Sequence, residues 1–145
     1  MAALKNKKIV GASFPNATQI VKVIYDFALD GAMASPLDVI EAEDDIVILG
    51  FFAKVLTTCT SGGSATLAVG VSGGDVDVLM GDTAVAGLVA NAFFAPPQVL
   101  TEGTPNTMSP QLPIKLASGE KIVADTTTAS FLTGKIEFTF IITKF

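Results

Sequence analysis

Apolar and polar residues alternate along much of this chain, a pattern typical of β-strands rather than helices. The clearest example spans residues 135–145, where four apolar side chains at every second position are separated mainly by polar ones. Successive side chains of a strand point to opposite faces, so the pattern predicts a strand with one buried face. The four residues predicted to face the core are Ile136, Phe138, Phe140 and Ile142.

Several other short segments have strand character and are separated by turn residues such as Gly and Pro. Asp82 could cap one short helix over residues 83–91, where apolar residues recur at helical spacing. About eight strands and one short helix favour an all-β fold, a β-sandwich of jelly-roll or Greek-key type. An up-and-down barrel is the alternative. Besides 135–145, the predicted extended segments are 20–28, 36–40, 46–56, 65–71, 93–100, 113–117 and 121–125.

The segment Ile46–Leu56 is the most apolar in the chain, and both of its alternating sets of side chains are hydrophobic. A central strand covered on both faces has this composition, and so does a strand with one face in the fold and the other in a subunit interface. Residues 57–64 then predict a turn around Gly62-Gly63. We therefore expect 46–56 and 65–71 to form a hairpin.

Phenylalanine is unusually common, with 10 residues against one Tyr and no Trp. Adjacent residues on a strand point to opposite faces, so neither adjacent Phe pair can fill a single core. One member of each pair is therefore a candidate for contact with another subunit. The candidate interface residues are Phe51, Phe52, Phe93 and Phe94. Pro96 and Pro97 place any strand near the second pair at a sheet edge.

Residues 1–19 show little periodicity and are predicted to be an extended N-terminal arm, followed by one β-sandwich domain over 20–145. We expect the arm to dock on a neighbouring molecule, with Ile9 and Phe14 as its apolar contacts. Only a short apolar run follows the lysines at its start, so a signal peptide is not expected.

The residue types present argue against catalysis. The chain has no His, Arg or Trp, which removes the commonest general base and metal ligand. We expect no enzyme activity and no catalytic, cofactor-binding or metal-binding residues. A formal charge of −5 without a basic stripe also disfavours nucleic acid, and the apolar runs are too short for a membrane helix. The single cysteine, Cys59, is interpreted as a small buried hydrophobe.

Two acidic segments invite a metal or catalytic hypothesis. Asp75, Asp77 and Asp82 could offer oxygens to Ca²⁺, but they lack the pattern of known calcium loops. A solvated turn and a helix cap are the favoured interpretation, with calcium left open. The cluster at 41–45 is interpreted as an acidic loop that keeps a sheet edge soluble.

Four segments in order resemble small virion structural proteins of tailed bacteriophages, a group that includes capsid decoration (cement) proteins. These segments are 23–31, 55–70, 75–86 and 132–138. The resemblance implies a structural protein that is made in the cytoplasm of a bacterial host. It would sit on the exterior of the capsid, often as a homotrimer, and bridge capsomers of the major capsid protein. The second hypothesis is a tail-associated β-sandwich that binds a host receptor or a carbohydrate.

Overall fold

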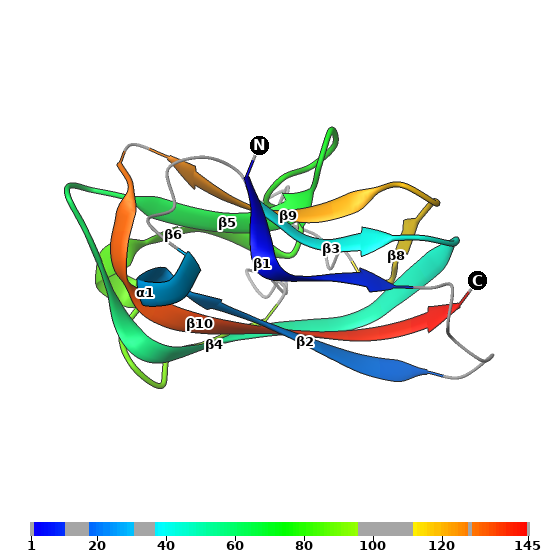
Figure 1. Cartoon of the computed structure of the whole chain (residues 1–145), viewed down its shortest axis with the longest axis horizontal. Coiled ribbons are helices and arrows are strands. Elements are labelled where there is room, and N and C mark those ends of the chain that lie inside the picture. The colour runs from blue at the N-terminus through cyan, green and yellow to red at the C-terminus, as the bar shows by residue number, and fades with distance from the viewer. Residues whose placement is uncertain (1, 11–17, 31–36, 96–111, 128, 145) are drawn as a thin grey trace, which may run out of the picture.

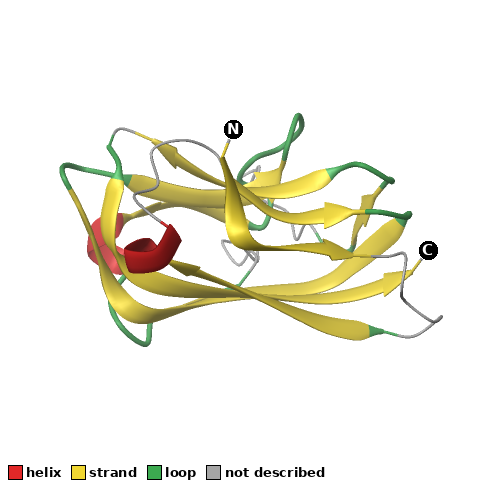
Figure 2. Cartoon of the chain, in the orientation of Figure 1, coloured by secondary structure: helices red, strands yellow, loops and turns green. Residues whose placement is uncertain are grey.

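The fold is a sandwich of two stacked β-sheets (Figures 1 and 2). The computed structural model describes residues 2–10, 18–30, 37–95, 112–127 and 129–144, with backbone alone for 2–10 and 127. These residues form ten strands, one four-residue α-helix and one 3₁₀ turn. The predicted β-sandwich is confirmed. The predicted loop at 101–110 lies outside the described residues.

Sheet I has the strand order β1-β3-β9-β5-β6 and forms the upper layer in Figure 1. All its pairings are antiparallel except that of β1 with β3, which is parallel. Strand β9 lies between β3 and β5, so a late segment separates two earlier ones. The strands are β1 (Ala2–Val10), β3 (Leu37–Ala42), β9 (Lys121–Thr127), β5 (Thr66–Val71) and β6 (Met80–Ala84).

Sheet II has the strand order β2-β10-β4-β7, with β8 also paired to β4. Its longest strands are β4 and β10, which pair antiparallel through much of their length. Strand β7 is an edge strand, as the prolines that follow it predicted. The strands are β2 (Gln19–Asp26), β10 (Phe131–Lys144), β4 (Ile46–Ser61), β7 (Phe93–Phe94) and β8 (Ile114–Leu116).

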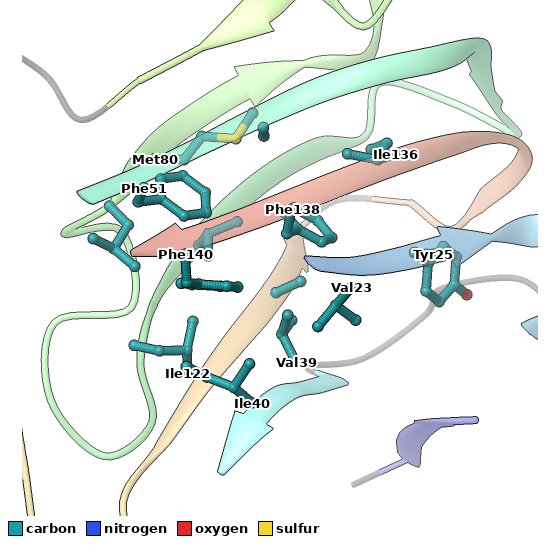
Figure 3. Packing of buried hydrophobic residues seen from close by; sticks show 14 of the residues in the cluster. Val23, Tyr25, Val39, Ile40, Phe51, Met80, Ile122, Ile136, Phe138 and Phe140 are labelled. Atoms are coloured by element: carbon teal, nitrogen blue, oxygen red, sulfur yellow. The ribbon is translucent and has the colours of Figure 1, made fainter. Parts of the chain in front are cut away.

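The hydrophobic core fills the space between the two sheets. Phe138 and Phe140 of β10 are fully buried there, on the side of the strand that faces Ile40 and Ile122 of sheet I (Figure 3). The alternation predicted for the last strand is confirmed, because Ile136, Phe138, Phe140 and Ile142 are all buried in one cluster. The strand begins at Phe131, earlier than predicted.

The predicted hairpin between 46–56 and 65–71 is wrong. Strand β4 belongs to sheet II and β5 to sheet I, so the chain crosses from one layer to the other at residues 62–65. Strand β4 pairs instead with β10 on one side and with β7 and β8 on the other. The up-and-down barrel is excluded as well, because sequence neighbours seldom pair: among the described strands, only β5 and β6 do so.

The predicted helix over 83–91 is also wrong in extent. Thr83 and Ala84 complete strand β6, and only the 3₁₀ turn η1 (Val85–Gly87) follows. Pairing with β5 satisfies the backbone there, and Gly87 has poor helix propensity. The α-helix is α1 (Phe27–Asp30), at the end of β2.

Part of the predicted N-terminal arm, residues 2–10, is a strand of the sandwich. Ala2–Val10 forms β1, which runs parallel to β3 at the edge of sheet I. Gln19 already belongs to β2. The extended conformation expected for 1–19 is present in β1, but its backbone pairs within the domain, because β3 offers it an open edge.

Candidate interaction surface

The first phenylalanine pair is divided between the core and the outer face of sheet II. Phe51 is buried, with its ring centroid 5.2 Å from that of Phe140 and 6.4 Å from that of Phe138. Phe52 points the opposite way, as alternation along β4 requires, and is half-buried. Phe51 is therefore a core residue, and its selection as an interface candidate was wrong. Phe52 remains a candidate.

The second pair is divided in the same way. Strand β7 pairs with β4 so that Phe94 is opposite Ala53 and Phe93 is opposite Lys54. Phe94 packs against the core, whereas 60% of Phe93 is exposed. The ring centroids of Phe52 and Phe93 lie 5.3 Å apart. The two outward phenylalanines thus contact one another across neighbouring strands.

Three further apolar residues extend this surface across the sheet. Ile20 of β2 is opposite Ile141 of β10, which is opposite Gly50 of β4. Ile20 is 67% exposed, and Leu49, beside the irregular step in the β4–β10 pairing, is 45% exposed. We call this surface the sheet II face. Its apolar members are Ile20, Leu49, Phe52, Phe93 and Ile141.

Sequence reasoning did not single out Ile20, Leu49 or Ile141. The available clue was the second apolar set of the 46–56 segment, which indicated a partner for the other face of that strand. Ile20 and Ile141 lie beside this apolar set of β4 because β2, β10 and β4 pair in that order. This pairing connects positions more than 90 residues apart in the chain.

Thr139 lies at the middle of the sheet II face, opposite Lys22 on one side and Phe52 on the other. Its position in β10 points outward, yet the side chain is only 1% exposed. Its hydroxyl oxygen has no hydrogen-bond partner among the described residues. Other atoms of the chain therefore cover it, and Thr139 adds no exposed polar group to the middle of this face.

The charged groups of this face carry both signs. Lys22 Nζ lies 3.6 Å from Glu137 Oε1. Lys54 is opposite Glu137 in the β4–β10 pairing but forms no ion pair with any described residue. These three side chains place opposite charges beside the apolar residues.

The two candidates from the N-terminal segment are less well placed. The backbone of Ile9 belongs to β1 and is opposite Glu41 of β3. Phe14 lies outside the described residues. An interface role for either residue stays a prediction.

The acidic segments have structural partners. In the 41–45 cluster, Asp44 pairs with Lys144 at 3.2 Å and Asp45 with Lys115 at 3.8 Å. The Asp45 carboxylate also accepts a hydrogen bond from the backbone N–H of Ser118 at 3.1 Å. These contacts join the β3–β4 turn to neighbouring segments of the sandwich.

Asp75 and Asp77 lie close together in the loop after β5. A side-chain hydrogen bond with Asp75 raises the pKa of Asp77 above its usual value, with smaller effects from burial and from the charges of Asp75 and Asp82. Within the described ranges, no three acidic, Cys or His side chains form a group that could hold a metal ion.

Cys59 is a buried free thiol, as predicted. Burial raises its pKa to about 11, so the protonated form dominates at neutral pH. A cavity of about 330 Å³ opens nearby, lined by residues including Leu132 and Gly134. Its charged groups, Asp26 and Lys135, are paired with each other at 3.3 Å. The cavity therefore offers a ligand no uncompensated charge.

No helix in the described part of the chain is long and apolar enough to cross a membrane. No known protein family and no curated protein matches the sequence. One solved structure is similar in fold: a chain of the "Capsid of Ralstonia phage GP4" aligns with a TM-score of 0.57 and 12% sequence identity. The alignment covers 94% of this chain and 90% of that one, so the similarity extends over almost the whole sandwich.

Proposed function

We propose that this chain is a structural protein of a phage virion, a capsid decoration protein that attaches to the outside of the head. The observation that carries the proposal is the fold similarity to a chain of a phage capsid, which extends over nearly the full length of both chains. The resemblance of four sequence segments to phage virion proteins supports the same assignment independently of the fold.

The surface chemistry also supports a binding role. A protein that works as part of a shell assembles, with its own copies or with shell proteins, through broad contact between surfaces rather than through a pocket. The sheet II face offers three large, well-exposed apolar side chains in one region. Exposed apolar surface of this kind is typical of protein interaction sites.

In this role the protein acts as a homo-oligomer, with a trimer as the assembly that the resemblance implies, and its second partner is the major capsid protein. Each copy contacts neighbouring capsomers and holds them together. Many modest contacts on one shell add up to strong attachment. Once one binding site of an oligomer is occupied, its remaining sites are held close to their own targets on the shell.

The decisive experiment uses heads from the phage that encodes the chain, prepared from a mutant lacking this gene. Purified protein is added, the heads are pelleted, and bound particles are imaged by electron cryomicroscopy. We expect saturable binding, density on the outer surface of the head, and heads that withstand higher temperature. Phage tails serve as the comparison sample. Density on tails alone would favour the tail-associated binding module, and failure to bind heads would contradict the proposal.

A further inference from the structure

We propose that copies of this chain associate with one another through the sheet II face, defined above by Ile20, Leu49, Phe52, Phe93 and Ile141. The inference rests on the homo-oligomer part of the proposed function and is independent of attachment to a head. The occupant of the face is a second copy of the same chain.

The first argument is the continuity of the apolar surface. Ile20, Leu49 and Phe93 are 67%, 45% and 60% exposed, and they come from three different strands. Ile141 connects Ile20 to the centre of the sheet, and the Phe52 ring connects the centre to Phe93. Burying such a surface against a partner is favourable in proportion to the apolar area removed from water.

The second argument is that the charges on this face suit a copy of itself. The face carries Lys22 and Lys54 together with Glu137, so it holds both signs within a small area. Lys54 lacks an ion-pair partner within the described part of its own chain and is exposed. Rotation of a second copy over the face can bring Lys54 of one chain towards Glu137 of the other. A strongly acidic or strongly basic partner would match only one of the two signs.

The third argument comes from the opposite side of the sandwich. A Cβ atom on Gly70 of β5 would lie 2.2 Å from the backbone of Val76, so the loop carrying Asp75 and Asp77 covers that part of sheet I. Asp125 also points outward there, because its neighbour Ala124 is in the core. With a net charge of −5, copies that meet through sheet II keep these carboxylates apart, whereas contact through sheet I brings them together.

The test is the mass of the full-length protein in solution, measured by light scattering and sedimentation over a range of concentrations at low and high salt. We expect the wild type to be a multiple of 14.9 kDa at both salt concentrations, because apolar burial dominates the contact. Leu49→Lys and Phe93→Lys should each weaken association by about tenfold or more, since a charge would be buried in the interface.

Val76→Lys is the matched control, because Val76 is an apolar residue of comparable exposure, at 38%, on the opposite side of the sandwich. It should keep the wild-type mass. Circular dichroism and thermal unfolding of all three variants verify that the fold is retained. A monomeric wild type would overturn the inference, as would face variants with wild-type mass or a control that dissociates equally.

The outcome is separable from that of the head-binding experiment. A monomeric protein that binds heads, and loses that binding in Phe93→Lys, would assign the face to the shell; the inference would fail while the decoration role stood. If the protein is an oligomer that dissociates in the face variants but never binds heads, the inference stands and the decoration role fails.

Discussion

Gly134 of β10 packs directly against Cys59 of β4. A Cβ atom on residue 134 would lie 2.6 Å from the Cys59 Sγ atom and 2.8 Å from its Cα atom. Gly134 also has a φ of +127°, a backbone conformation that other residues rarely adopt. The β4–β10 pairing changes register around this point. The two longest strands of sheet II can approach here only because residue 134 has no side chain.

We expect Gly134→Ala to lower the free energy of unfolding by about 2 kcal/mol or more, since overpacking and backbone strain act together. Gly119→Ala is the control. Gly119 also has a positive φ, +89°, but beyond its two chain neighbours no atom lies within 4 Å of the position that a Cβ would take. Chemical denaturation of both variants separates the contact from the backbone effect. Equal losses would show that the approach to Cys59 contributes nothing.

Phe138→Ala should destabilise the fold by about 3–5 kcal/mol, because it removes a fully buried ring from the core. Phe93→Ala removes the same group from an exposed position and should change the stability of the isolated chain much less. Urea unfolding at a concentration where the protein is monomeric measures both. Similar losses would contradict the division of the phenylalanines between the core and the sheet II face.

Thr139→Val should leave the fold intact and raise its stability by about 1 kcal/mol. The substitution replaces a buried hydroxyl that lacks a hydrogen-bond partner among the described residues with a methyl group of similar size. Thermal unfolding measures the effect. The comparison is Thr58→Val, at an exposed position on β4, which removes a hydroxyl that accepts a hydrogen bond from the backbone N–H of Ala90. Destabilisation by Thr139→Val would indicate that its hydroxyl is hydrogen-bonded.

We expect the stabilising contribution of the Asp26 carboxylate to be lost in acid. Its carboxylate accepts a hydrogen bond from the backbone N–H of Ala28 at 2.9 Å, and this bond, with help from Lys135, holds its pKa below the usual 3.8. A lowered folded-state pKa stabilises the protein above the unfolded value, and that contribution is lost as the pH falls through the folded value. We therefore expect the stability advantage of the wild type over Asp26→Asn to diminish below about pH 4. An advantage independent of pH would exclude this ionisation as the cause.

Deletion of residues 1–10 should destabilise the domain, because residues 2–10 form a strand of sheet I. Strand β1 pairs with β3, and the deletion leaves β3 as an unprotected sheet edge. Lower thermal stability and aggregation on heating are expected. Alanine replacement of Lys5, Lys7 and Lys8 retains the strand backbone and serves as the control. A deletion variant as stable as the wild type would mean that the β1–β3 pairing adds no stability.

Much of the local structure was predictable from the sequence. Alternation identified β10 and its buried residues, and the two apolar sets of β4 indicated that both of its faces contact other groups. The division of each phenylalanine pair between two faces also follows from local geometry. The sequence did not reveal which member of each pair faces the core, because that depends on which side of the strand the second sheet covers.

The errors concerned relations between distant segments. Turn residues at 62–64 suggested a hairpin, yet β4 and β5 lie in different sheets, since β10 and β9 take the positions beside them. Helical spacing at 83–91 was outweighed by the pairing of Thr83 and Ala84 with β5 and by backbone hydrogen bonds of Leu88 and Asn91 with β4. Residues 2–10 have a weak pattern of their own and form a strand beside β3.

The order of residues alone therefore determined that this chain forms short strands, which side chains of each strand share a face, and that it lacks histidine, arginine and tryptophan for chemistry. Alternation is a property of consecutive residues, so it can be read along the chain. Only the tertiary structure decided that Ile20, Ile141, Leu49, Phe52 and Phe93 form one surface. That surface depends on the pairing and register of β2, β10, β4 and β7, which are set by how all the strands together bury a common core.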